Sequence, residues 1–157
     1  MNLSDHFTLE ELTVTDTGLP NIPSDQHKQR LAYLASYALE RVRTLLGTPI
    51  KINSAFRSQA VNDKVHGSKT SAHLRGDAAD MVPSGIDLKD AYIVMAHDLG
   101  LGYDQIIWEA HTTPRGGVTR WIHLGLAQVG SQPRRQQLIF TPKTDGKYLP
   151  FDEQYIV

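Results

Sequence analysis

The apolar positions between residues 27 and 46 recur at the spacing of one helical face. Three or four residues separate each position from the next, which places them on one side of a helix. Gly47 follows the last of them and favours a helix end there, because glycine adopts the left-handed conformation at little cost. The pattern predicts one amphipathic helix over residues 27–46. Its inward face consists of Leu31, Leu34, Ala38, Val42 and Leu45.

A second amphipathic pattern predicts a helix over residues 88–99. Asp87 and Asp90 are suitable N-terminal caps, and Gly100 ends the pattern. The Thr-x-x-Glu spacing in the opening stretch HFTLEEL is that of a capping box, which predicts a further short helix there. The inward residues of the second helix are Leu88, Ala91, Tyr92, Met95 and Leu99.

Short apolar or alternating stretches predict the strands. These stretches are TPIKINSAF, AADMV, YDQIIWE, TRWIHLGLA and, as an edge strand, QLIF. The segment AHTTPRGGV contains proline and two glycines, which predicts a hairpin loop at residues 110–118. Helices mixed with antiparallel strands indicate an α+β fold, with a small antiparallel sheet flanked by helices. We expect one domain over residues 1–157, with its core at about 6–126 and a C-terminal tail at 127–157.

Length, composition and charge narrow the class of protein. The 157 residues suit one domain, which at this size buries roughly 70% of its unfolded surface. Because there is no cysteine, a metal ion would have only nitrogen and oxygen ligands. The formal net charge of −1 argues against a broad surface for nucleic acid. No apolar run approaches the roughly 20 residues of a membrane span. We expect a monomer without nucleic-acid binding or membrane insertion.

The stretch SAHLRGDAAD combines an imidazole and a carboxylate with unusually small neighbours. Small residues let the backbone approach a ligand closely, and Gly76 can turn the chain without steric penalty. His73 and Asp80 would then offer nitrogen and oxygen to a metal such as zinc. The alternative at this point is an exposed His73 and an Asp80 that caps a turn.

The third ligand is expected on a neighbouring strand, and His123 in RWIHLGL is the best choice. It alternates with Trp121 and Gly125 on one face, while Ile122 and Leu124 face the other way. The alternative is a buried histidine whose hydrogen bonds are satisfied within the core.

The central block INSAFRSQAVNDKVHGSKTSAHLRGDAADM resembles that of the zinc D-alanyl-D-alanine carboxypeptidases, which are LAS-type metallopeptidases, and of their phage endopeptidase relatives. The shared pattern is S-x-x-R-S, then V-N, then G-x-x-x-S-x-H-x-x-G-x-A-x-D. The later stretch IIWE…RWIHLGL resembles the closing strand pair of the family, and HFTLEEL resembles the opening of its phage-type members. The resemblance covers roughly residues 6–126.

The resemblance implies a zinc site on the sheet, with His73, Asp80 and His123 as ligands. It also assigns substrate binding to Arg57, whose guanidinium suits a bidentate contact with a carboxylate. Members of the family cleave peptide bonds in peptidoglycan stem peptides. Ser71 is expected to bind substrate or to hydrogen-bond within the loop, and it has no adjacent base that would make it a nucleophile.

The general base departs from the family pattern, because many relatives carry a glutamate where this chain has Arg120. We expect Glu109 to replace it, since the predicted hairpin brings Glu109 close to the strand of His123. The alternative is a surface carboxylate at a strand end. His111 is a second catalytic residue to consider, as an acid or an oxyanion stabiliser, whereas the spacing of Asp77 suits a solvated residue.

These features predict a zinc peptidase that acts on peptidoglycan peptides, as a D,D-carboxypeptidase or an endopeptidase. The N-terminus MNLSDHFTLEELTV lacks the basic and apolar regions of a signal peptide. We therefore expect synthesis in the cytoplasm and action at the bacterial cell wall, in phage or prophage lysis after release by a holin, or as part of a virion. Two alternatives remain: a non-catalytic wall-binding or phage structural module, and a D,D-dipeptidase or amidase with a small soluble substrate.

Overall fold

The computed structural model describes residues 1–157 as one α+β domain around a six-stranded sheet. The strand order is β1-β2-β4-β3-β5-β6. The strands are β1 (Ile50–Ser54), β2 (Ala78–Pro83), β3 (Gln105–Thr112), β4 (Val118–Gly125), β5 (Gln136–Phe140) and β6 (Leu149–Pro150). The helices are α1 (Leu9–Leu12), α2 (Asp25–Tyr33), η1 (Leu34–Leu39), α3 (Glu40–Leu46), α4 (Gln59–Lys64), η2 (Ala72–Arg75), α5 (Leu88–Asp98), η3 (Pro142–Thr144) and η4 (Glu153–Tyr155).

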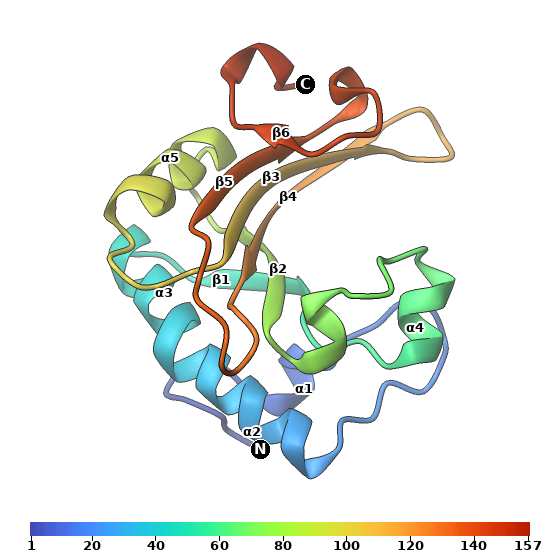
Figure 1. The fold of residues 1–157 in the computed structure, drawn as a ribbon, viewed down its shortest axis with the longest axis vertical. Helices are drawn as coiled ribbons and strands as arrows, with labels where there is room; N and C mark the ends of the chain where they lie inside the picture. Colours follow the sequence, from blue (N-terminus) through green and yellow to red (C-terminus); the bar gives the residue numbers. More distant parts are fainter.

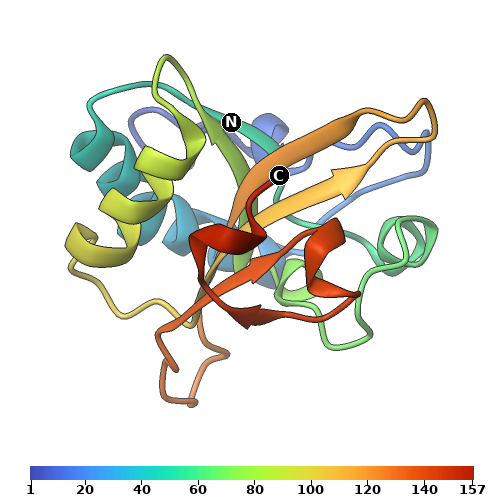
Figure 2. The same cartoon turned by 90° about the horizontal axis from the view of Figure 1, so that it is seen from above.

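The helices are divided between the two sides of the sheet. Helices α2, α3 and α5 lie on one side, and α4 lies on the other with the loop that follows it (Figure 1). The view from above shows the same division (Figure 2). The main apolar core fills the space between the sheet and α2, α3 and α5, where the predicted inward residues Leu31, Val42 and Met95 are fully buried. The opposite side of the sheet is free to form the polar cleft described below.

The predicted helix over residues 27–46 is present, but it begins earlier and contains an irregular middle. It starts at Asp25, because Ser24 caps it. The Ser24 hydroxyl accepts a hydrogen bond from the backbone N–H of His27, and Nδ1 of His27 accepts one from the backbone N–H of Ser24. Its middle turn, Leu34–Leu39, is a π-helix, and four of its six residues are buried. The other two helix predictions are confirmed, with Asp87 rather than Asp90 as the cap of α5 and a complete capping box at Thr8.

Two strand predictions were wrong. The hairpin loop is only residues 113–117, because β3 and β4 remain paired up to Thr112 and Val118. β5 is not an edge strand, since it pairs with β3 on one side and with the short β6 on the other. Its pairing with β3 is parallel, so the sheet is mixed rather than purely antiparallel. After β4 the chain reverses, so that β5 runs parallel to β3 and pairs with the edge of β3 that β4 leaves free.

None of the helices combines the length and apolar composition that a membrane span requires.

Candidate metal centre and cleft

The sheet register places two of the predicted ligands directly opposite each other. Asp80 on β2 pairs with His123 on β4, and His123 pairs in turn with Ile107 on β3. Directly paired residues on neighbouring strands share a face of the sheet. Asp80 and His123 therefore point together into the cleft, away from the side that α2, α3 and α5 cover.

His73 reaches the same point from the short helix η2, which precedes β2. The Ser71 hydroxyl caps η2 by accepting a hydrogen bond from the backbone N–H of His73. The His73 ring is buried, and its Nδ1 lies 2.6 Å from the carbonyl oxygen of Ala55. A carbonyl can only accept, so Nδ1 donates to it, and Nε2 is the ring nitrogen left to face a metal ion. Nε2 lies 3.3 Å from Oδ1 of Asp80.

Gly76 turns the chain between His73 and β2. Its φ of +76° is in the left-handed region, and a Cβ there would lie 3.2 Å from the backbone oxygen of His27. Left-handed strain alone should lower the free energy of unfolding of Gly76→Ala by roughly 1–3 kcal/mol, and the contact with α2 should make its loss larger than that of Gly85→Ala. Urea denaturation measures the change. Gly85→Ala is the matched control, because Gly85 has a φ of +68° but nothing within 4 Å. An equal loss in both variants would contradict the role of the contact with α2.

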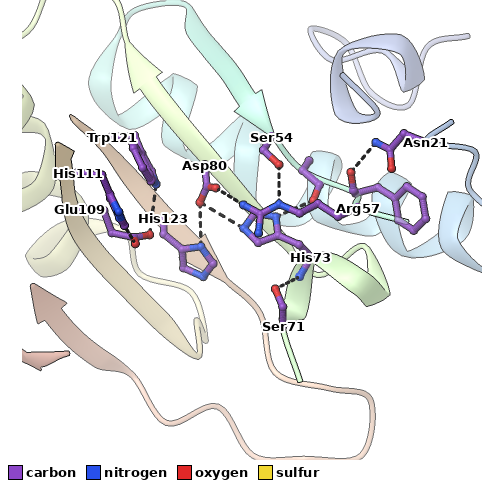
Figure 3. Close-up of polar contacts among 12 residues, drawn as sticks. Asn21, Ser54, Arg57, Ser71, His73, Asp80, Glu109, His111, Trp121 and His123 are labelled. Carbon is purple, nitrogen blue, oxygen red and sulfur yellow. Dashed lines mark hydrogen bonds and ion pairs between the residues drawn. The ribbon is translucent and has the colours of Figure 1, made fainter. Parts of the chain in front are cut away.

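The side chains of His73, Asp80 and His123 converge (Figure 3). One donor atom from each lies within 4.8 Å of the others, and all three residues are buried. Nδ1 of His123 is 2.9 Å from Oδ1 of Asp80, so His123 presents Nδ1 where His73 presents Nε2. Gly125 leaves room for this ring, because a Cβ there would lie 3.2 Å from Nε2 of His123.

Asp80 and His123 shift each other's pKa in opposite directions. Burial by itself would raise the pKa of Asp80, but the adjacent His73 and His123 outweigh burial and hold that pKa far below its usual range. Burial would lower the pKa of His123, but the hydrogen bond and charge of Asp80 outweigh burial and raise it. Asp80 is therefore an ionised oxygen ligand, and a metal ion at this point competes with the proton for the ring of His123.

The donor set fits a catalytic zinc ion. Two imidazole nitrogens and one carboxylate oxygen make the three protein ligands of such a site, and the fourth position is left to water or substrate. The bond between Nδ1 of His73 and Ala55 is the kind of outer contact that orients a ligating histidine. His73, Asp80 and His123 are therefore the residues that would hold the ion.

Arg57 lies beside the donor set, where it contacts Asp80. Its Nη2 donates to Oδ2 of Asp80 at 2.9 Å, and its Nε donates to the Ser54 hydroxyl at 3.0 Å (Figure 3). Asp80 thus turns one oxygen to the histidines and the other to Arg57. The sequence pattern did not reveal this second role of Arg57, the orientation of a ligand, nor the part of Ser54 in it. Arg57 also lines the cleft.

Glu109 lies in the same cleft, on the strand next to that of His123. It pairs in register with Trp121, two residues before His123, so it shares the face of both. Oε2 of Glu109 accepts a hydrogen bond from Nε1 of Trp121 at 3.2 Å, and Oε1 lies 3.2 Å from Nε2 of His111. The carboxylate is buried and oriented from two sides. The structure therefore places it where the sequence analysis expected it, and it is not an exposed strand end.

Arg120 and Asp77 differ from what their sequence positions suggested. Arg120 lies on the opposite face of β4 from His123, and its Nε donates to the carbonyl oxygen of Val157 at 2.6 Å. Its identity therefore has no direct effect on the cleft. Asp77, which we expected to be solvated, is only 2% exposed. It accepts from Arg30 at 2.6 Å and from Arg75 at 3.0 Å, because a buried carboxylate requires such partners.

The cleft around these residues has a volume of about 1,130 Å³. Its floor is the sheet, with Ile107 and Leu138 beyond His123, and one wall is the loop after α4, which includes Ser71. The lining also includes Tyr148, just before β6, to which no sequence pattern pointed. An open cleft of this size accommodates an extended peptide better than a single small molecule.

A buried donor set with an oriented carboxylate beside it in one cleft is the arrangement of a metal-dependent hydrolase. A family model described as Peptidase M15 matches residues 5–107. The chain therefore belongs to this peptidase family, whose zinc D-alanyl-D-alanine carboxypeptidases its motifs resemble. It is a zinc-dependent peptidase for peptidoglycan-derived substrates. A comparison with curated proteins finds no match.

The matched residues include Arg57, His73 and Asp80 but end before Glu109 and His123. The placement of these last two residues at the site rests on the sheet register and the hydrogen bonds described above.

Proposed function

We propose that this chain hydrolyses a peptide bond in the stem peptides of bacterial peptidoglycan, as a D,D-carboxypeptidase or an endopeptidase. One observation carries the proposal: the buried carboxylate of Glu109 shares a cleft with the donor set of His73, Asp80 and His123. A module that only binds the wall has no need for a buried carboxylate beside three metal-ligating groups.

The chain's own residues divide the chemical work. Bound zinc would polarise the scissile carbonyl and lower the pKa of the attacking water toward neutrality. Glu109 accepts the proton of that water and returns it to the leaving amine. Trp121 and His111 hold the Glu109 carboxylate in place through its two oxygens. His111 also lines the cleft and is the second catalytic residue of this proposal, an acid or an oxyanion stabiliser, which donates to the substrate from Nδ1 only when both ring nitrogens carry a proton.

Arg57 is proposed to bind a carboxylate of the substrate. Arg57→Lys is expected to raise KM about tenfold for a peptide with a free terminal carboxylate, because lysine cannot make the charged, two-pronged contact. Steady-state kinetics with the same peptide in its amidated form is the control, and there the two enzymes should have similar KM values. An equal rise in KM for both peptides would contradict carboxylate binding and indicate that Arg57 acts only through Asp80.

The experiment that tests the function is digestion of purified peptidoglycan with and without a zinc chelator. New amino groups are measured, and the fragments are identified by mass spectrometry. Release of single D-alanine residues indicates a carboxypeptidase, and release of longer peptides indicates an endopeptidase. If a folded, zinc-loaded protein releases no fragment from walls of several chemotypes but still binds them, the wall-binding alternative replaces this proposal.

The place of action follows from the substrate. We propose that the enzyme acts at the bacterial cell wall, in phage or prophage lysis or within a virion, because its opening segment resembles that of phage-type relatives. Expression in bacteria with and without a holin tests this role. Lysis that requires the holin supports the lysis role, and intact cells in both cases contradict that role and leave action from a virion.

A further inference from the structure

The last part of the chain contributes a side chain to the cleft. This C-terminal segment, residues 141–157, lies outside the stretch that the family model matches. In Figure 1 it is the red region next to β5. Tyr148 belongs to this segment, yet it lines the same cleft as Asp80, Glu109 and His123.

The C-terminal segment is fixed to the sheet at several points. β6 pairs with β5, and the Thr141 hydroxyl donates to the carbonyl oxygen of Tyr155 at 2.7 Å. Arg120 donates to the carbonyl oxygen of Val157, which ties the end of the segment to β4. Arg120, which stands where many relatives carry the general base, thus helps to hold the segment that carries Tyr148. These contacts hold the C-terminal segment against the sheet and so fix the position of Tyr148.

Tyr148 is the last ring in a row of aromatic side chains beside Glu109. Trp121 stacks on His111 with ring centroids 4.7 Å apart, and His111 stacks on Phe140 at 5.0 Å. The ring centroids of Phe140 and Tyr148 are 4.7 Å apart. The first two rings also hold the Glu109 carboxylate. The row therefore sets the position of the tyrosine ring relative to the group proposed as the base.

The Tyr148 hydroxyl is available as a hydrogen-bond donor. The side chain is about half exposed, and its hydroxyl has no hydrogen-bond partner in the chain. Partial burial, together with the carboxylates of Glu109 and Asp80, raises the pKa of Tyr148 to about 12, although Arg57 opposes the shift. The phenol is therefore protonated at neutral pH. The three groups that influence it are those that surround the reaction centre.

We propose that Tyr148 contacts the substrate and donates a hydrogen bond to the carbonyl oxygen of the bond that is cleaved. This inference rests on the proposed peptidase function. The carboxylates of Glu109 and Asp80 can only accept, His111 already contacts Glu109, and Arg57 is proposed to hold a substrate carboxylate. The Tyr148 hydroxyl is therefore the neutral donor in the cleft that is left without a partner. A neutral phenol is suited to stabilise the negative charge that develops on the oxygen, because it does so without adding a charge to the ground state.

The test compares Tyr148→Phe with the wild-type enzyme, both loaded with zinc, on the peptidoglycan peptide that the digestion identifies. Tyr148→Phe removes only the hydroxyl. We expect kcat to fall roughly 100-fold with little change in KM, as for other donors that act on the transition state. Zinc content and melting temperature should stay unchanged. Tyr155→Phe is the matched control, since Tyr155 belongs to the same segment but does not line the cleft.

A second measurement does not depend on turnover. A phosphinate analogue of the scissile bond imitates the charged transition state, so its inhibition constant should rise for Tyr148→Phe by about the factor lost from kcat/KM. An unchanged kcat, or a higher KM alone, overturns the inference while the peptidase function stands. If the wild-type enzyme itself releases no peptide, the proposed function fails and this inference fails with it.

Discussion

Glu109→Gln is expected to lower kcat by roughly 10²–10⁴-fold, the usual contribution of a general acid–base group. Glutamine has the same shape and its amide oxygen can still accept the Trp121 hydrogen bond, so the cleft keeps its structure. Its amide cannot take up the proton of the attacking water. The measurement is steady-state cleavage of the identified peptide, with the zinc content of each preparation determined in parallel.

The control for this prediction is Glu153→Gln, which removes an exposed carboxylate that pairs only with Lys89. Its kcat should equal that of the wild type, because exposed ion pairs contribute little to structure. If Glu109→Gln retains nearly full kcat while zinc is bound, Glu109 is not the base. His111, which contacts Glu109 and is also in the cleft, would then be the next residue to replace.

Asp80→Ala is expected to abolish both zinc binding and activity. Asp80 is the one group that contacts all three neighbours, His73, His123 and Arg57. Without it two histidines remain as metal ligands, and the positive charge of Arg57 is left unbalanced next to them. Even outer contacts of a metal site are worth 10–100-fold in affinity, and the loss of a direct ligand should exceed that. Zinc content after dialysis measures the effect.

Thermal unfolding provides an independent measurement of the same change. An ion that binds only the folded chain stabilises it, so the melting temperature of the wild type should fall when zinc is removed by a chelator. The melting temperature of Asp80→Ala should not respond to zinc. The control is Asp98→Ala at the exposed end of α5, which should behave as the wild type. A zinc-dependent melting temperature in Asp80→Ala would show that the ion is held elsewhere.

Local sequence patterns were sufficient for most of the fold. The helical periodicity of residues 27–46 and 88–99 and the capping residues around them predicted the helices, because these signals act within a few turns of the chain. They did not predict the π-helical segment within the long helix or the parallel pairing of β5 with β3. That pairing depends on which strand edge remains free after β3 and β4 have formed a hairpin, which no local pattern encodes.

The same distinction applies to the site. The spacing of His73 and Asp80 in SAHLRGDAAD and the alternation around His123 made these residues candidates, because residue types and their faces are local properties. The resemblance to a zinc peptidase family then selected them as the donor set. The salt bridges of buried Asp77 and the contact of Arg57 with Asp80 were not predicted. Arg30 and Asp77 are 47 residues apart in the chain, and only the packed structure brings them together.

The sequence by itself determined the kind of chemistry: nitrogen and oxygen ligands, a family motif and a carboxylate on the right strand. The tertiary structure decided how these groups cooperate. It turned Arg120 away from the cleft, oriented Glu109 through Trp121 and His111, and brought Tyr148 from the C-terminal segment into the same cleft. The physical reason is that ligand identity depends on the residue type, whereas orientation depends on contacts between segments that are distant in sequence.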